Sequence, residues 1–320
     1  MERPSIPSRP KIVFMGTPDF ALPALKALID HGHLVTAVVT QPDRPKGRGK
    51  KLTPPPVKVL ALEHGIEVLQ PERASEESFC DIIREKAPDL IIVVAFGQIL
   101  KKIFLDIPGW GVINIHGSLL PDYRGAAPIQ RTILNGDTMA GLTVMRMDEG
   151  MDTGPILFRK EVPVLPDETA GQLHDRLALI SGDLIIESLG RMVANPVVEI
   201  PQDDARATYA AKIEKQMGLI DWSLSAERVS ALIRGLDPRP GAYSLLEGKN
   251  VKLFSSHVLE GGSTDGVPGR VIRPKDGGLI VETGQGTLEI REIQFPGKRK
   301  IPTCDFLRGF SLPEGTILGE

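Results

Sequence analysis

Three side chains in this sequence, an amide, an imidazole and a carboxylate, stand where they could carry out chemistry together. Asn114 and His116 are two residues apart at the end of an apolar run, and Asp152 lies in a turn between Gly150 and Gly154. On a strand, a spacing of two places both side chains on the same face. An amide can donate to a tetrahedral oxyanion, and an imidazole and a carboxylate can move protons. The set suits acyl transfer to an amine.

Each of these residues also has a structural interpretation. An Asn-x-His pair at a strand end can simply be a hydrogen-bonding pair, and Asp152 before Thr153 and Gly154 can be a turn aspartate. A serine nucleophile is not indicated, because Ser118 is not in a Gly-x-Ser-x-Gly elbow. If the site is catalytic, the sequence therefore favours direct transfer over a covalent intermediate.

The composition narrows the classes of protein. With 320 residues the chain is longer than one core usually needs, so two domains are expected. A net charge of −3 means that any polyanion must be bound by a local patch. Cys80 and Cys304 form no disulfide framework or zinc motif, and we expect no metal. No apolar run approaches the roughly 20 residues of a membrane span, and the polar N-terminus predicts a cytoplasmic protein.

Strands and helices are expected to alternate over the first half of the chain. This alternation predicts a Rossmann-like, doubly wound parallel sheet with helices on both faces. The expected strands are 11–16, 34–40, 66–69, 90–95, 111–116 and 142–147, and the expected helices are 21–30, 57–64, 75–86, 128–135 and 169–191. Pro128 suits the first turn of its helix and Gly136 suits the C-terminal cap.

The pattern changes after the long helix. Residues 1–195 are predicted to be the catalytic domain, 196–214 a linker and 215–320 a second domain. In the last part a helix at 226–235 precedes short strands at 242–246, 251–259, 269–273, 278–283 and 287–293, with turn signals between them. These features predict a small antiparallel barrel or sandwich, and the form we expect is a small β-barrel (OB-like) domain.

The first strand ends in Gly16-Thr17-Pro18, which is not a dinucleotide-binding fingerprint. That fingerprint needs glycines where the backbone approaches a pyrophosphate, and Pro18 removes an N–H donor there. The sequence therefore excludes a nicotinamide-dependent dehydrogenase despite the Rossmann-like pattern.

Two motifs give the sequence a specific resemblance. The stretch Asn114-Ile-His-Gly-Ser-Leu-Leu-Pro-Asp-Tyr-Arg-Gly-Ala-Ala-Pro-Ile-Gln130 and the stretch Met147-Asp-Glu-Gly-Met-Asp-Thr-Gly154 are similar to the signatures of the 10-formyltetrahydrofolate-dependent formyltransferases. Within that family the similarity is greatest to members that act on methionyl-tRNA, since residues 16–20, 41–51 and 220–223 also fit. The resemblance covers nearly the whole chain.

The resemblance implies roles for particular residues. Asn114, His116 and Asp152 would be catalytic, and 10-formyltetrahydrofolate would be the formyl donor and co-substrate. The donor would be bound by two loops and one acidic residue, namely Ser118, Leu119, Leu120, Pro121, Ala95, Phe96, Gly97, Gln98, Ile99 and Asp148. In such pockets backbone groups bind the polar edge of a ring and apolar side chains cover its faces.

Two basic segments could bind the phosphates of a tRNA. Residues 41–51 hold five cations and one anion, and in the family this loop engages the tRNA acceptor end. A solvated surface loop is the alternative. The second domain has 14 Lys and Arg against 13 Asp and Glu, so a binding face must come from clustering. The candidate residues are Arg44, Lys46, Arg48, Lys50, Lys51, Lys298, Arg299 and Lys300, with Arg48 the foremost.

The prediction is formyl transfer from 10-formyltetrahydrofolate to the α-amino group of methionyl initiator tRNA, for translation initiation. A sugar-nucleotide or purine-precursor formyltransferase with the same catalytic core is the alternative enzyme. A tRNA-binding or folate-binding module without catalysis is the alternative of another class. The basic loop and the second domain favour the tRNA formyltransferase over the sugar-nucleotide or purine-precursor enzyme. The intact trio argues against a binding module without catalysis. We expect a monomer.

Overall fold

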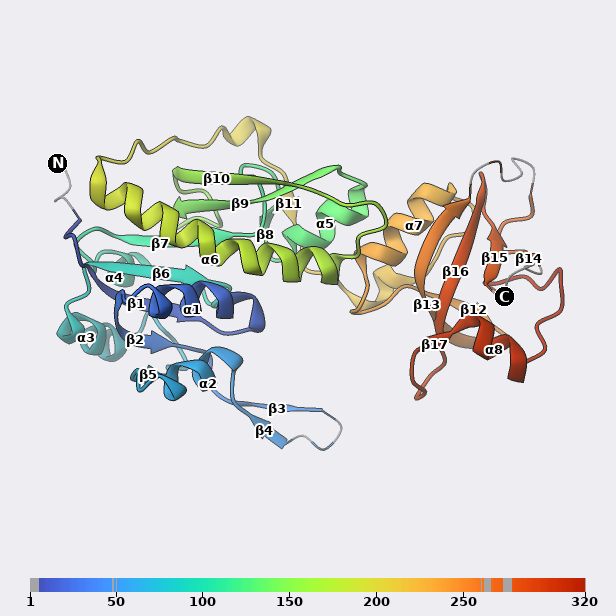
Figure 1. Cartoon of the computed structure of the whole chain (residues 1–320), viewed down its shortest axis with the longest axis horizontal. Helices are drawn as coiled ribbons and strands as arrows, with labels where there is room; N and C mark the ends of the chain where they lie inside the picture. Colours follow the sequence, from blue (N-terminus) through green and yellow to red (C-terminus); the bar gives the residue numbers. More distant parts are fainter. Residues whose placement is uncertain are drawn as a thin grey trace. The chain divides into compact units, whose positions relative to one another are not determined.

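A mixed seven-stranded sheet forms the core of the first of two units into which the chain divides (Figure 1). The computed structural model describes residues 6–47, 49, 51–259, 261, 266–272 and 278–319. Unit 1 comprises Met1–Gly125, Gly141–Val162 and His174–Tyr209, and unit 2 comprises Ala126–Ala140, Pro163–Leu173 and Ala210–Glu320. The predicted boundaries at 195 and 215 remain a prediction.

The sheet of unit 1 has the order β10-β9-β7-β6-β1-β2-β5. Its strands are β1 (Lys11–Gly16), β2 (Leu34–Val39), β5 (Val68–Leu69), β6 (Leu90–Val94), β7 (Val112–His116), β9 (Met139–Arg146) and β10 (Ile156–Pro163). The five strands from β7 to β5 pair in parallel, as predicted for a doubly wound sheet. The strand β9 differs, since it pairs with β7 antiparallel, and β10 was not predicted.

Helices cover both faces of this sheet, which confirms the predicted layers. On one face, Phe79 and Ile83 of α3 and Phe104 of α4 pack with Val13 and Met15 of β1. Figure 1 shows α1 and the long α6 across the other face. The helices are α1 (Leu22–Asp30, after the 3-10 turn Asp19–Ala21), α2 (Pro56–Glu63), α3 (Glu77–Lys86), α4 (Lys102–Leu105) and α6 (Ala170–Ala194).

A glycine lets α6 approach α1 closely. A Cβ atom at Gly182 would lie 3.0 Å from the carbonyl oxygen of Pro23, which is tighter than an ordinary contact. Gly182 costs helix propensity relative to alanine. The close contact with Pro23 explains why a glycine, rather than a better helix former, occupies this position.

The basic segment at 41–51 was predicted as a loop, and the structure shows a two-stranded hairpin around it. Strand β3 (Arg44–Lys46) pairs with β4 (Lys51–Thr53). Asp43 fixes the base of the hairpin, because its carboxylate accepts hydrogen bonds from Lys58 and Gln70, both at 2.9 Å. Both hydrogen bonds lower the pKa of Asp43, and the bond from Gln70 has the larger effect.

Unit 2 contains an antiparallel sheet with the order β12-β13-β16-β15-β14, and β17 pairs with the end of β16. Its elements are α5 (Pro128–Asn135), α7 (Ala226–Gly235), β12 (Tyr243–Leu246), β13 (Lys249–Leu259), β14 (Val271–Ile272), β15 (Leu279–Glu282), β16 (Thr287–Gln294), β17 (Ile301–Pro302) and α8 (Thr303–Gly309). The strongly curved, open form is that of a half-barrel, which agrees with the predicted small β-barrel class.

Helix α5 belongs to unit 2 although it begins within the motif that starts at Asn114. It packs on α7 at Gly235, where a Cβ atom would lie only 2.6 Å from Leu134. The helix has Pro128 in its first turn and ends at Gly136, which adopts a left-handed conformation with φ +75°. Both local predictions for this helix are confirmed.

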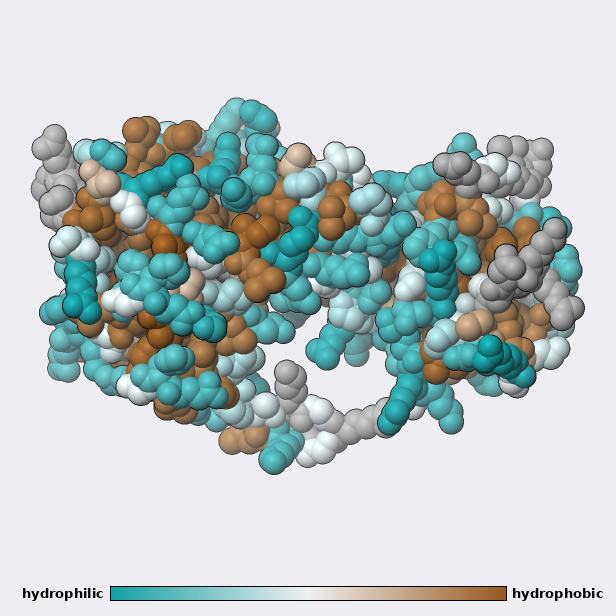
Figure 2. Space-filling model, viewed as in Figure 1, coloured by the Kyte–Doolittle hydropathy of each residue, from teal (hydrophilic) through white to brown (hydrophobic). Residues whose placement is uncertain are grey.

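Several short elements lie between these larger ones. They are β8 (Arg124–Gly125), β11 (Tyr209–Ala210), and the 3-10 turns Asp204–Arg206 and Lys215–Gly218. On the face shown in Figure 2 hydrophilic residues dominate, and hydrophobic ones gather in small groups. In the part of the chain that the structure describes, no helix has the length and apolar character needed to cross a membrane.

Candidate active site

Strand β7 carries Asn114 and His116 into a nearly buried position. Asn114 is 9% exposed and His116 is 6% exposed. Val93 of β6 lies opposite Asn114, and Thr143 of β9 lies opposite His116, so a strand flanks β7 on each side. The sequence spacing of two therefore becomes a shared face in the middle of the sheet.

The contacts of His116 define where its protons are. Its Nε2 atom lies 2.9 Å from the carbonyl oxygen of Tyr123. A carbonyl oxygen only accepts, so Nε2 carries a hydrogen. The other nitrogen, Nδ1, lies 3.6 Å from Asp152 Oδ2. That separation suits an ion pair but exceeds a hydrogen bond, which leaves Nδ1 available to a reacting group.

Asp152 is held by the backbone on one side only. Its Oδ2 atom accepts a hydrogen bond of 2.8 Å from the N–H of Gly125. Asp152 itself adopts φ +56°, a left-handed conformation that aspartate tolerates better than most residues. Among the described residues, Oδ1 has no hydrogen-bond partner. This oxygen is free to accept a proton.

Asn114 is the third member of the trio, and its side-chain amide is available to a ligand. In the described part of the chain its carboxamide makes no hydrogen bond, although the residue is 9% exposed. Its amide nitrogen and oxygen are not among the described buried atoms that lack a partner, so they reach solvent, where water or a ligand can bond to them. The structure thus brings His116 and Asp152 together and presents the Asn114 amide on the same strand as His116.

The loop after β7, predicted to bind folate, is fixed by Thr143. The Thr143 hydroxyl donates to the carbonyl of Ser118 at 2.7 Å and accepts from the N–H of Leu120 at 3.1 Å. Arg159 donates to the Leu120 carbonyl. The Ser118 hydroxyl donates to the carbonyl of Asp122 at 2.5 Å, so it serves the loop as a structural group.

The loop after β6, the second predicted folate segment, presents open backbone. Gly97 has φ +87°, and a Cβ atom there would meet nothing within 4 Å. The Phe96 carbonyl accepts from Thr17 at 3.1 Å and from Gln41 at 3.2 Å, which fixes the loop, and Ile99 is 79% exposed. Because β6 and β7 are parallel neighbours, this loop and the Ser118–Pro121 loop leave the same edge of the sheet.

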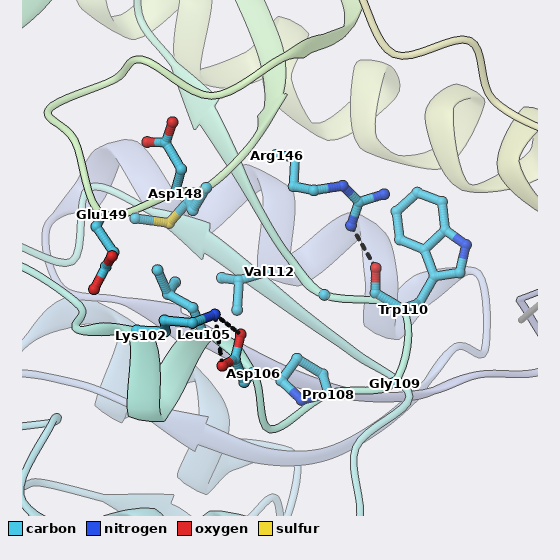
Figure 3. Close-up of a pocket in the computed structure, with 12 residues that line it drawn as sticks. Lys102, Leu105, Asp106, Pro108, Gly109, Trp110, Val112, Arg146, Asp148 and Glu149 are labelled. Carbon is cyan, nitrogen blue, oxygen red and sulfur yellow. Dashed lines mark hydrogen bonds and ion pairs between the residues drawn. The ribbon is translucent and has the colours of Figure 1, made fainter. Parts of the chain in front are cut away.

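A cavity of about 450 Å³ is bounded by the loop that leads to Asp152 (Figure 3). Its volume is that of a small-molecule pocket. Of the predicted folate residues only Asp148 lines it, and the others do not. The lining residues are Lys102, Leu105, Asp106, Pro108, Gly109, Trp110, Gly111, Val112, Arg146, Met147, Asp148 and Glu149. Most of this lining had no signal in the sequence.

Arg146 forms one wall of that cavity. Its guanidinium stacks over the Trp110 ring at 4.3 Å, donates to the Trp110 carbonyl and pairs with Glu199 at 2.8 Å. Figure 3 shows the guanidinium facing the Trp110 backbone. The Asp148 carboxylate accepts from Thr153 at 2.7 Å and from the N–H of Gly150 at 3.1 Å. Asp148 therefore shapes the loop that carries Asp152.

Sequence reasoning missed the residues that support the trio. Gln202 and Thr208, in the segment predicted to be a linker, contact the loops of Asp152 and Tyr123. Thr143 and Arg159 support the Ser118–Pro121 loop. Thr143 lies in a predicted strand, but each of these residues bonds to a partner that is distant in sequence, and no signal in one sequence identifies that partner.

The predicted tRNA-binding residues fall into two sets, and those whose side chains the structure describes are exposed. Arg44 and Lys51 lie on the hairpin of unit 1, where Arg44 is 3.6 Å from Glu72. Lys298 and Arg299 are exposed on unit 2. Lys300 pairs with Glu292 at 2.9 Å and lies 4.9 Å from the Phe254 ring centroid. Lys46 belongs to β3, and Arg48 and Lys50 lie outside the described residues.

Comparison with known proteins identifies the class. The formyl transferase family matches residues 10–189, and the C-terminal domain of formyl transferases matches residues 212–311. The chain belongs to the formyl transferase family, which confirms the resemblance of the two motifs. Among the described residues, no group of three or more His, Cys, Asp or Glu could hold a metal ion.

Whole-chain similarity narrows the family. A methionyl-tRNA formyltransferase of Geobacter sulfurreducens is 50% identical over 97% of both chains. One of Ruminiclostridium cellulolyticum is 44% identical over 97% of this chain and all of the other. The branch of the family to which this chain belongs is that of the methionyl-tRNA formyltransferases.

Solved structures share the fold at lower sequence identity. WlaRD, a sugar 3N-formyl transferase, has a TM-score of 0.66 at 18% identity and covers 92% of this chain and 100% of the other. HypX from Aquifex aeolicus, in complex with tetrahydrofolic acid, has a TM-score of 0.62 at 19% identity and covers 94% of this chain and 47% of the other. These similarities concern the fold alone.

Proposed function

We propose that this protein transfers the formyl group of 10-formyltetrahydrofolate to the α-amino group of methionyl initiator tRNA. The arrangement of the trio supports the formyl-transfer chemistry. The Asn114 amide makes no hydrogen bond within the described residues and lies on the same strand as His116, and His116 Nδ1 lies 3.6 Å from Asp152 Oδ2. The observation that carries the acceptor is the whole-length similarity to methionyl-tRNA formyltransferases.

The reaction proceeds by direct attack. The amine nitrogen bonds to the formyl carbon, and the formyl oxygen becomes an oxyanion that the Asn114 amide stabilises by donating a hydrogen bond. His116 stabilises the same oxygen as an imidazolium, with Nε2–H held by the Tyr123 carbonyl. Asp152 Oδ1 accepts the proton that the attacking amine loses.

Collapse of the intermediate completes the transfer. The bond between the formyl carbon and N10 of the folate breaks, and N10 takes up a proton, so that the products are formylmethionyl-tRNA and tetrahydrofolate. No enzyme-bound acyl group forms, and no metal takes part in a step. The proton balance closes, because one proton leaves the amine and one arrives at N10.

The folate donor fits the two loops at the ends of β6 and β7. The open backbone at Gly97 can meet a flat ring, and the exposed Ile99 can cover it. Ser118–Pro121 would line the other side, and Asp148 would act by shaping the adjacent loop. When bound, the donor supplies the activated formyl group, and these residues orient it toward Asn114.

The acceptor tRNA is bound by basic side chains of both units. Lys298 and Arg299 of unit 2, together with Arg44, Lys46, Arg48, Lys50 and Lys51 of the hairpin segment, would neutralise phosphates and release counterions. A monomer in the cytoplasm, where charged tRNA is available, is part of the same proposal.

The test is a formylation assay with two acceptors. The protein is incubated with 10-formyltetrahydrofolate and methionyl initiator tRNA, and in parallel with a sugar nucleotide that carries a primary amine. We expect formylated tRNA and an unchanged sugar. Formylation of the sugar without formylation of the tRNA would contradict the proposed acceptor, and no transfer to either would contradict the activity.

A further inference from the structure

The segment 202–208 contacts the backbone of Asp152 and the backbone of Tyr123, whose carbonyl meets His116. The Gln202 side-chain NH₂ donates to the carbonyl of Asp152 at 2.8 Å and to the carbonyl of Gly154 at 2.7 Å. The Gln202 side-chain oxygen accepts from Arg124 Nε at 3.0 Å and Nη2 at 2.9 Å. One amide thus joins a buried arginine to the loop of Asp152.

The orientation of that amide is fixed by its partners. A guanidinium only donates, and a peptide carbonyl only accepts, so the oxygen must face Arg124 and the nitrogen must face the loop. All four hydrogen bonds of the amide are satisfied in this way. A side chain that lacks the two donors cannot make the same link.

Arg124 anchors the other end of the link. The residue is 1% exposed, and its Nη2 atom pairs with Asp204 Oδ1 at 2.8 Å. The residue after it, Gly125, donates its N–H to Asp152 Oδ2 at 2.8 Å. The Asp152 loop is therefore held twice from the same point of the chain, once at its backbone through Gln202 and once at its carboxylate.

Thr208 of the same segment acts on the histidine side. Its hydroxyl accepts from the N–H of Tyr123 at 2.8 Å, and its carbonyl accepts from the N–H of Arg124 at 2.9 Å. Tyr123 has φ +61°, and its carbonyl is the one that holds His116 Nε2. The segment therefore sets the position of both His116 and Asp152.

We propose that Gln202 is a positioning residue for the transfer reaction, acting through Asp152. Its amide holds the left-handed backbone at Asp152 so that Oδ2 meets Gly125 and Oδ1 stays free to take the amine proton. This role rests on the proposed catalytic function of Asp152. Small displacements of a reacting group can cost about 10² in rate, so a polar contact remote from the substrate can control turnover.

The closing experiment compares Gln202→Glu with Asp203→Asn. A glutamate keeps an acceptor for Arg124 but turns carboxylate oxygen toward two carbonyl oxygens. We expect kcat to fall about 10- to 100-fold, with KM for the folate and for the tRNA within about twofold and Tm near that of the wild type, because Arg124 remains paired. Asp203 is exposed, and within the described part of the chain its carboxylate accepts a hydrogen bond only from the N–H of Ala205, so Asp203→Asn should keep the wild-type kcat.

Repeating the comparison in an Asp152→Asn protein distinguishes a positioning role of Gln202 from a purely structural one. In an Asp152→Asn protein, measured in single turnovers, Gln202→Glu should have no further effect, since the group it positions is already lost. The same loss of kcat in both backgrounds would overturn the role, as would an unchanged kcat in the single variant. If Gln202→Glu lowers Tm, Gln202→Met, which has similar length and no donor, is compared in the same two backgrounds by kcat alone, because methionine also removes the acceptor of the buried Arg124.

The two proposals fail in different ways. If the wild-type protein does not formylate methionyl-tRNA, the proposed function is wrong and the role of Gln202 in it falls too. If the wild type turns over and the variants match it, only the role of Gln202 is wrong.

Discussion

The site on β7 and the basic segments differ in how their polar groups are held. His116 is 6% exposed and Arg124 is 1% exposed, and the nitrogens that define their positions meet named acceptors. Arg299 and Lys298 are exposed on a turn of unit 2, and Lys51 is exposed on the hairpin. The site on β7 holds a few polar groups at hydrogen-bonding distances, whereas the basic segments expose their charged side chains to solvent.

This difference fits the roles proposed above for the two regions. Transition-state charge develops at one atom, so donors must be preorganised within hydrogen-bonding distance of it. A phosphate backbone spreads charge over many groups, and accessible cations can meet it with little positional demand. Changes on β7 should therefore alter kcat by large factors, and changes in the basic segments should alter tRNA affinity and its salt dependence by small ones.

The largest effect is expected for Asp152→Asn. The variant keeps the size of the side chain but cannot accept the amine proton, and general-base catalysis is worth about 10²–10⁴ in rate. We expect kcat to fall by about 10³, with KM for both substrates within a few-fold. Single-turnover formylation measures the rate, and far-UV circular dichroism checks the fold. Wild-type kcat in this variant would remove Asp152 from the mechanism.

The next effect is expected for Asn114→Ala. Loss of one oxyanion donor costs about 10²–10³ in kcat, and the amide has no structural hydrogen bond to lose among the described residues. The free energy of unfolding should therefore stay near that of the wild type. Steady-state kinetics and thermal unfolding measure the two quantities. A large loss of stability with little loss of kcat would show that Asn114 is a structural residue.

The sequence predicted the strands that carry the site because their patterns are local. The apolar run 90–95 and the Asn-x-His spacing are sufficient to place β6, β7 and the shared face of Asn114 and His116. The prediction failed where the partner is distant in sequence. β9 turns antiparallel to β7, and nothing in residues 139–146 states the direction of pairing.

The supporting contacts were beyond the sequence for the same reason. Gln202 meets Arg124, which lies 78 positions earlier, and Thr208 meets Tyr123, which lies 85 positions earlier. These bonds depend on the assembled sheet, and the segment that supplies them lacks periodicity. A buried arginine in the motif after Asn114 implies that acceptors exist, but it does not say where in the chain they lie.

A smaller effect is expected for Arg299→Gln in unit 2. The loss of one phosphate contact should raise KM for the tRNA a few-fold and lower the slope of log affinity against log salt by about 0.7–0.9. The matched control is Arg308→Gln, since Arg308 pairs with Asp305 at 2.9 Å and is 78% exposed. Binding of the tRNA over a range of salt concentrations gives both slopes. Equal slopes for Arg299→Gln and the wild type would place the phosphate contact elsewhere.

Asp237 of unit 2 differs from both regions compared above, because its carboxylate is buried but contacts no positively charged group of the described residues. The residue is 8% exposed, and its carboxylate has no hydrogen-bond partner among the described residues. Burial raises the pKa of Asp237, which the charge of Lys300 partly offsets. A raised pKa in the folded state means that the folded protein keeps this proton at a pH where the unfolded chain has released it.

The smallest effect is therefore a gain in stability for Asp237→Asn. The stability of the wild type falls as pH rises from the unfolded pKa of Asp through the raised folded pKa, and the full cost is present above that folded pKa. We expect the variant to have a higher Tm at pH 7, by about 2–4 °C if the gain is about 1 kcal/mol, and the difference to shrink toward pH 4. Calorimetry of both proteins from pH 4 to pH 8 measures this difference, in which the titration of shared groups cancels. An equal or lower Tm for the variant at pH 7 would show that the Asp237 carboxylate stabilises unit 2, and buried charge in this unit would then be as well compensated as it is on β7.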